Sequence, residues 1–273
     1  MGERTGSLLV LPLVVFLLVF FVYPVASMLL RSVEPGVWTL EAYRELIGSR
    51  VFWRVIGITL EIAATVTVSC LVLAFPLAYW LARLRQGVAS LALILVLVPF
   101  WTSILVRSYA WMALLERHGI VNNLLMALHV TDAPVKLLNT RLSVCLAMIH
   151  VLLPFMVLPI YAALRGMDWR LVLAAESLGA RPFGVLRQVV LPMVRAGVGA
   201  GVTLVFTLAV GFYITPVLVG ASGDVMIAVL INDQVGNLAW PSASAMSVLL
   251  LALVLGVSWG LARMTGARRM VTP

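Results

Sequence analysis

Six long apolar runs constrain the fold of this chain more than any other feature of its sequence. Each run is close to the roughly 20 residues that an α-helix needs to cross the hydrocarbon core of a bilayer. A helix is expected for each run, because backbone polar groups find no water to bond in that core. The sequence therefore predicts an all-α membrane protein with six transmembrane helices, at about Leu8–Leu30, Val55–Leu81, Val88–Val106, Leu142–Leu164, Ala196–Val219 and Ala243–Ala262.

Composition excludes the main alternative classes. Of 273 residues, 63% are hydrophobic and only 11% are charged, whereas soluble proteins are about 45–50% apolar and about 25% charged. A soluble domain cannot bury this much apolar surface, and a disordered chain has the opposite composition. The net charge of +8 does not indicate a nucleic-acid partner, because basic residues at the ends of spans set membrane topology.

The distribution of basic residues favours cytoplasmic termini. Arg83 and Arg85 lie in a short turn after the second run, and Arg268 and Arg269 lie in the tail. The loop 220–242, which would then face outward, contains no lysine or arginine. Because lysine and arginine concentrate in cytoplasmic loops, both termini are predicted to be cytoplasmic.

Sequence motifs for catalysis are missing. Lys136 is the only lysine in the chain, so there is no Gly-x-x-x-x-Gly-Lys loop for a nucleotide phosphate. His118, His129 and His150 are scattered without the spacing of metal ligands. We therefore expect no catalytic residue, no metal site and no cofactor on this chain.

The loop 165–195 is predicted to be structured. Asp168 can cap a helix by accepting backbone N–H bonds, and a short amphipathic helix follows at Trp169–Leu178. Gly179 fits the position after a helix where φ is positive. Pro182 fits the first turn of a second short helix.

The function of this helix–glycine–helix element stays open on physical grounds alone. Trp169, Val172, Leu173 and Glu176 are predicted to lie near one face of the first helix. Such an element is either a docking site for a partner or a helix that lies on the lipid interface. Pro192 is expected either to end the second helix or to bend it into the next span.

The same loop resembles the EAA loop of permease subunits in bacterial ATP-binding-cassette importers. The segment 173–180 reads LAAESLGA, and Pro192 follows Gly179 at the spacing of the family. The pattern departs at its first position, where the glutamate of the family falls on Leu173, and Glu176 lies almost one helical turn further on. The residues that the resemblance assigns to coupling with an ATPase are Leu173, Ala174, Ala175, Glu176, Gly179, Ala180, Leu191 and Pro192.

Other stretches are similar to permeases of spermidine/putrescine importers. They run from the second span to the last, and importers of other small solutes share much of the pattern. The similar stretches are 98–103 (VPFWTS), 107–111 (RSYAW), 119–124 (GIVNNL), 153–161 (LPFMVLPIY) and 240–241 (WP).

The resemblance implies a fold, partners and a location. It implies a single transmembrane permease domain over residues 1–273, with the type I importer permease fold and a coupling loop at about 165–195. A second permease subunit, identical or different, would complete the path, and a dimer of ATPase subunits would bind ATP and Mg²⁺ and dock on the coupling loops. A periplasmic solute-binding protein would deliver the solute. The location implied is the bacterial inner membrane, with lipid around the spans.

Glu61 is the one acidic residue inside a predicted span and is a candidate for the substrate path. A charge within a span is costly, so such groups face the protein interior or a water-filled cavity. A polyamine is a polycation that a carboxylate would attract. The alternative for Glu61 is a structural ion pair, with Arg54 or Arg107.

Aromatic and acidic residues near the span ends are further candidates for the path. Aromatic faces attract cations, although aromatic belts at the membrane interface explain many such residues. The acids of the loop 220–242 either attract a cation, contact a binding protein or are simply solvated. These candidates are Trp101, Tyr109, Trp111, Tyr213, Asp224, Asp233 and Trp240.

Two functions are therefore compared. The first is a permease subunit of an importer driven by a separate ATPase, for polyamines or alternatively for another small solute. The second is a self-sufficient secondary carrier or channel. A carrier needs coupling-ion sites and often shows internal repeats, and a single intramembrane acid without a recognisable repeat disfavours it.

Overall fold

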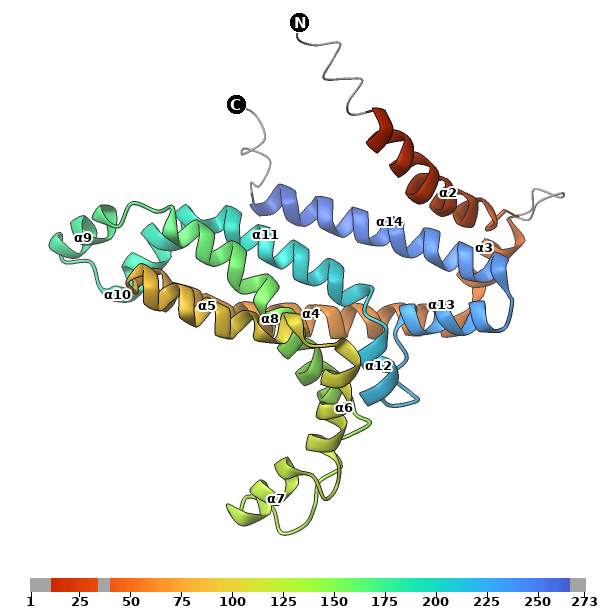
Figure 1. Ribbon diagram of the computed structural model, residues 1–273, viewed down its shortest axis with the longest axis horizontal. Helices are drawn as coiled ribbons and strands as arrows, with labels where there is room; N and C mark the ends of the chain where they lie inside the picture. Colours follow the sequence, from red (N-terminus) through yellow and green to blue (C-terminus); the bar gives the residue numbers. More distant parts are fainter. Residues whose placement is uncertain (1–10, 34–39, 266–273) are drawn as a thin grey trace, which may run out of the picture. The chain divides into compact units, whose positions relative to one another are not determined.

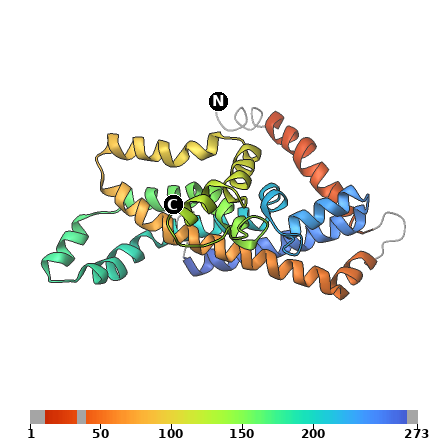
Figure 2. The same cartoon turned by 90° about the horizontal axis from the view of Figure 1, so that it is seen from below.

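The computed structural model describes residues 11–33 and 40–265, which form helices and no strand. Figures 1 and 2 show the arrangement of these helices in two views. The elements are η1 (Leu18–Val22), α2 (Tyr23–Leu30), α3 (Glu41–Gly48), α4 (Arg50–Arg83), α5 (Gln86–Trp101), α6 (Ile104–Leu115), α7 (Ile120–Ala127), α8 (Arg141–Arg165), α9 (Arg170–Ser177), α10 (Pro182–Val185), η2 (Leu186–Val190), α11 (Leu191–Val210), α12 (Ile214–Val219), α13 (Ile227–Gly236) and α14 (Trp240–Thr265).

The helices include five that are long and apolar enough to cross a membrane. A sixth span is present if α5 and the helical segment Ile104–Ala127 count as one broken span. The described part of the chain therefore confirms an all-helical protein with several apolar spans. The first residues of the first predicted span, the arginines of the tail and both chain ends lie outside the described residues. The five long spans are Leu11–Leu30, Arg50–Arg83, Arg141–Arg165, Pro182–Val210 and Trp240–Leu261.

The third predicted span, Val88–Val106, is interrupted after Trp101. α5 ends at Trp101, where the backbone N–H and the hydroxyl of Thr102 both donate to the carbonyl of Pro99, at 3.4 and 2.9 Å. The segment that follows is bent by 92° relative to α5. The apolar run therefore continues past a break that hydropathy does not reveal.

The fifth predicted span, Ala196–Val219, is also broken. α11 ends at Val210, with Gly211 as its C-cap, and α12 follows as a helix of only 6 residues. The chain turns there, with the Phe212 N–H donating to Ala209 O at 3.2 Å, although the sequence stays apolar. The span begins earlier than predicted instead, because the helix that contains α11 starts at Pro182.

The chain forms two compact units. Unit 1 comprises Met1–Arg54 and Leu230–Leu253, and unit 2 comprises Val55–Val229 and Val254–Pro273. In unit 1 the Tyr43 hydroxyl donates to Ser32 Oγ at 2.8 Å, and the Arg31 guanidinium lies 5.5 Å from the ring centre of Trp240. These contacts join α3 to the end of α2, and the end of α2 to the start of α14.

The core of unit 2 is built on α8 and α11, which pack closely together. Close packing depends on the glycine pair of α11: a Cβ atom at Gly197 would lie 2.5 Å from Ala163 Cβ, and one at Gly201 would lie 2.9 Å from Met156 Sδ. The Gly197-x-x-x-Gly201 spacing therefore serves the close packing of α8 and α11. A Cβ atom at Gly256 or at Gly260 would meet nothing within 4 Å.

Candidate functional site

The first half of the predicted coupling loop folds as expected. α9 spans Arg170–Ser177, one residue shorter at each end than predicted, and Asp168 Oδ1 accepts the backbone N–H of Arg170 at 3.0 Å. Gly179 has a φ of 81°, which confirms the left-handed turn. The Gly179 N–H donates to Glu176 O at 2.9 Å and the Ala180 N–H to Ala175 O at 3.1 Å. This pair of bonds is the Schellman motif that ends a helix and reverses the chain.

The second half of the loop is the beginning of a span. Pro182 occupies the first turn of α10, as predicted, and α10, η2 and α11 then follow without a gap. Of the two alternatives for Pro192, the structure therefore shows continuation into the next span. The π-helix η2 accounts for the continuous helix. A proline clashes with the carbonyl four residues earlier in an α-helix, and the wider π-turn just before Pro192 relieves that clash.

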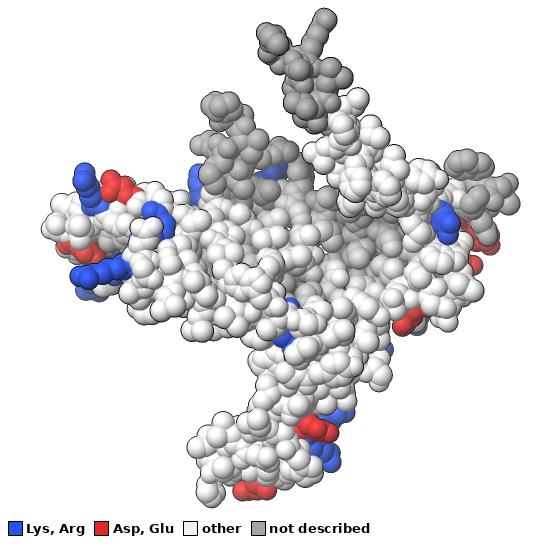
Figure 3. Space-filling model, viewed as in Figure 1, with Lys and Arg blue, Asp and Glu red and all other residues white. Residues whose placement is uncertain are grey.

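In both views α9 and α10 extend beyond the ends of α8 and α11 (Figures 1 and 2). Their surface combines apolar and basic groups, since Leu173, Leu178 and Phe183 are 61%, 89% and 73% exposed and Arg170 and Arg181 are also exposed. Charged side chains gather at the α9–α10 end in Figure 3, whereas the neighbouring helices of unit 2 are nearly uncharged. An exposed apolar surface rimmed by charge is typical of a site that contacts another protein or the membrane.

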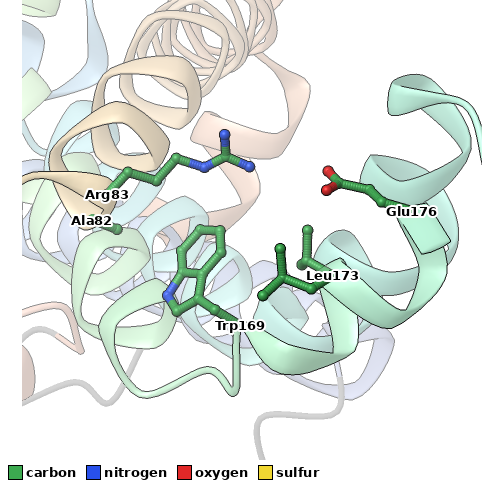
Figure 4. Close-up of a pocket in the computed structure, with 6 residues that line it drawn as sticks. Ala82, Arg83, Trp169, Leu173 and Glu176 are labelled. Atoms are coloured by element: carbon green, nitrogen blue, oxygen red, sulfur yellow. The ribbon is translucent and has the colours of Figure 1, made fainter.

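A cavity of about 370 Å³ lies between α9 and the end of α4. The four residues predicted to share one face of α9 all line it, which confirms that face. Figure 4 shows Arg83 and Glu176 on opposite sides of the cavity with Leu173 beside Glu176. The lining residues are Ala82, Arg83, Trp169, Val172, Leu173 and Glu176.

A cation–aromatic cluster attaches α9 to α4. The Arg83 guanidinium lies 4.4 Å from the ring centre of Tyr79 and 5.2 Å from that of Trp169. The same guanidinium donates to the Tyr79 hydroxyl, and the two rings are 5.7 Å apart. Sequence reasoning missed this cluster, although the Tyr79–Arg83 spacing of four residues was a signal for a contact on one helix face.

The other end of α8 carries an ion-pair network. Arg141, the first residue of α8, donates through Nη1 to Glu61 Oε2 at 2.7 Å and through Nε to Asp224 Oδ1 at 2.6 Å. The structural pairing expected for Glu61 was therefore assigned to the wrong arginines, because its partner is neither Arg54 nor Arg107. No local sequence pattern links the true pair, since Glu61 and Arg141 are 80 residues apart.

The aromatic candidates of unit 2 lie at the end of α5, on α6 and next to α12. Trp111 Nε1 donates to His150 Nδ1 at 3.3 Å and joins α6 to α8. Trp101, at the end of α5, is 71% exposed, and Tyr109 is 57% exposed. Tyr213 is half-buried at the start of α12.

The remaining two candidates belong to unit 1. Asp233 is exposed on α13, and Trp240 is half-buried at the start of α14 beneath the Arg31 guanidinium. Among residues 11–33 and 40–265, no group of three histidine, cysteine or acidic side chains could hold a metal ion.

Comparison with known proteins identifies relatives of this chain. It is 34% identical to the spermidine/putrescine transport system permease protein PotB of Escherichia coli strain K12 over 232 residues, which cover 84% of each chain. No protein-family model matches the chain.

Solved structures share the fold. A chain of a bacterial ABC transporter that imports the acidic polysaccharide alginate superposes with a TM-score of 0.77 and 17% identity, over 98% of this chain and 96% of that chain. The alginate transporter in complex with an alginate pentasaccharide-bound periplasmic protein gives a TM-score of 0.75 over the same shares.

The sequence relationship covers most of both chains and confirms the resemblance found in the motifs. The solved structures show a shared fold over 98% of this chain. The apolar helices agree with a multi-pass membrane protein. The chain therefore belongs to the family of ABC transporter permease proteins that includes PotB of the spermidine/putrescine transport system.

Proposed function

We propose that this chain is a permease subunit of a bacterial inner-membrane importer for polyamines such as spermidine and putrescine. The observation that carries the proposal is the 34% identity to PotB over 84% of the chain. The apolar spans and the exposed α9–α10 element are consistent with the proposal, because a permease needs membrane-spanning helices for the solute and a surface that binds its ATPase.

In this proposal six spans cross the membrane, with the broken α5–α6 pair as the third, and both termini are cytoplasmic. The bias of lysine and arginine towards the α9 side supports this orientation. The α9–α10 element then lies in the cytoplasm and the Glu61–Arg141–Asp224 network faces the periplasmic side.

The motor is a separate ATPase dimer that binds ATP and Mg²⁺ and docks on α9 of this chain and of a second permease subunit. Closure of the ATPase pair pushes α9, and the spans alternate between inward-open and outward-open states. Glu176 and Leu173 line the cavity against Arg83, so a push on α9 reaches α4 through the Tyr79–Arg83–Trp169 cluster. A periplasmic binding protein delivers the polyamine.

Uptake and co-purification test this function together. The permease is expressed with an ATPase, a second permease and a periplasmic binding protein from the same organism, and labelled spermidine and putrescine are offered to the cells. We expect the ATPase to co-purify with the permease, and we expect uptake to stop when the catalytic residues of the ATPase are replaced.

Two outcomes would overturn the proposal. Transport by this chain alone in liposomes would favour a self-sufficient carrier. Uptake of another small solute, with no uptake of either polyamine, would keep the importer but replace its substrate.

A further inference from the structure

The guanidinium of Arg141 lies between two carboxylates that belong to different parts of unit 2. Glu61 lies within α4 and Asp224 lies in the loop between α12 and α13, and each gives one oxygen to Arg141. No bond to the other oxygen of either carboxylate is found in the described part of the chain. Two carboxylates against one guanidinium leave a net charge of −1, so the network can still attract a cation.

The network is accessible in this chain. The side chains of Glu61 and Arg141 are 59% and 43% exposed, and that of Asp224 is 19% exposed. Charged groups beside apolar spans face water-filled cavities or protein and avoid lipid.

The backbone that carries the two acids is held by other bonds. At one end of the α12–α13 loop, the Ser143 hydroxyl and the Asn139 N–H both donate to Val219 O, at 2.7 and 3.2 Å. At the other end, the Ile227 N–H donates to the buried Thr59 Oγ1 at 2.9 Å, two residues from Glu61 on α4. The backbone segments next to the two acids are therefore held by bonds that do not involve Arg141.

We propose that Arg141 is an internal substitute for a substrate amine: it occupies the carboxylates of Glu61 and Asp224 in the unloaded permease and yields them to an ammonium group of the polyamine during transport. Guanidinium and ammonium groups carry the same charge and donate the same charge-assisted hydrogen bonds to carboxylates. This inference rests on the proposed function. It makes Arg141 a specificity-determining residue that favours cations able to compete with it.

Equilibrium binding of labelled spermidine to the purified complex of permeases and ATPase in nanodiscs tests the proposal. Removal of the internal competitor in Arg141→Gln is expected to tighten spermidine binding about tenfold, the effect of one charged hydrogen-bond partner. Adding Glu61→Gln to that variant is expected to abolish the gain, and Arg141→Lys, which keeps the cation, is expected to bind as the wild type does.

Glu45→Gln is the matched control, since Glu45 is an exposed acid on α3 of unit 1. This variant should leave spermidine binding unchanged. An assembled Arg141→Gln complex whose spermidine Kd is unchanged or weaker than that of the wild type would overturn the proposal. If Arg141→Gln does not assemble, Glu61→Gln decides, because it keeps the Arg141–Asp224 pair: weaker spermidine binding supports the proposal and wild-type binding contradicts it.

Uptake by the complete wild-type importer distinguishes a failure of the proposed function from a failure of the role proposed for Arg141. An importer that takes up neither spermidine nor putrescine overturns the proposed function, and the role of Arg141 falls with it. An importer that takes up polyamines, but whose Arg141→Gln complex binds spermidine unchanged, overturns only the role of Arg141.

Discussion

The two ends of α8 differ in how their structure arises. At Arg165 the helix leads into the α9–α10 element, whose turns are fixed by residues that are neighbours in the sequence: Asp168 caps α9 and Gly179 ends it. At Arg141, about 36 Å away along the helix at 1.5 Å per residue, an ion-pair network joins Glu61 and Asp224, which are 80 and 83 residues distant in the chain.

This difference suits the two ends of α8 to different tasks: the α9–α10 element can transmit a movement, and the Arg141 network can bind a cation. A short element with a rigid turn can transmit a push without long-range contacts of its own, provided that it is joined firmly to a span. A cation site needs charges from several elements, so its geometry can change when those elements move. The helix pair α8–α11 connects the two ends, and each prediction below acts on one part of this arrangement.

The largest effect is expected at the helix pair itself. Gly197→Leu places a side chain where Ala163 Cβ and Pro159 O lie 2.5 and 2.7 Å from the new Cβ atom, so α8 and α11 must separate. Overpacking of this kind costs about 1–3 kcal/mol or more. We expect little assembled importer in membranes, measured by co-purification with the ATPase. Gly256→Leu, with nothing within 4 Å of its Cβ atom, is the control and should assemble normally.

The next effect is expected at the turn after α9. Gly179→Leu forces a side chain into a left-handed conformation that costs about 1–2 kcal/mol, although nothing lies within 4 Å of the new Cβ atom. We expect about tenfold slower polyamine uptake while ATP hydrolysis continues. Gly179→Asn should recover most of the uptake, because asparagine tolerates this conformation. Equal uptake in the leucine variant and in Gly184→Ala would exclude a role for the turn.

A smaller effect is expected at the joint between α9 and α4. Trp169→Leu removes the ring that faces the Arg83 guanidinium, a contact of about 0.5–2 kcal/mol. We expect uptake to fall about three- to tenfold with normal assembly. Trp259→Leu removes the same kind of contact, with Arg263 on α14, and serves as the matched control. A larger loss of uptake in the control would show that the Trp169 contact has no special part in coupling.

The smallest effect is expected inside the cavity under α9. Glu176→Gln removes the charge proposed to contact the ATPase. Uptake should fall about two- to fivefold, the range expected when one exposed ionic contact is lost. The double variant Glu176→Gln with Leu173→Glu should recover uptake, because both positions line the same cavity and Leu173 occupies the place of the family glutamate. If the double variant transports no better than the single one, Glu176 does not stand in for that glutamate.

Local features of this molecule could be predicted from its sequence. The α9 helix, its cap at Asp168 and the positive φ of Gly179 all depend on residues within a few positions of one another. Because such patterns repeat in every helix of their kind, no knowledge of the tertiary structure was needed.

Features that depend on tertiary contacts could not be predicted. Hydropathy did not reveal the breaks after Trp101 and Val210, because the chain stays apolar where the helix axis changes. The partner of Glu61 was also misassigned, because only the folded chain brings Arg141 next to Glu61. The path candidates Trp101 and Tyr109 stay predictions, because exposure in one chain does not identify the surface they face in an assembled importer.

A photo-crosslinking amino acid at position 178 tests the central claim most directly. Leu178 is 89% exposed at the tip of α9, and Leu128, 63% exposed after α7, provides a matched position for comparison. In membranes that contain the complete importer, the account predicts a crosslink from position 178 to the ATPase subunit and none from position 128. A crosslink from position 178 to lipid alone, with no ATPase adduct in the presence or absence of ATP, would contradict it.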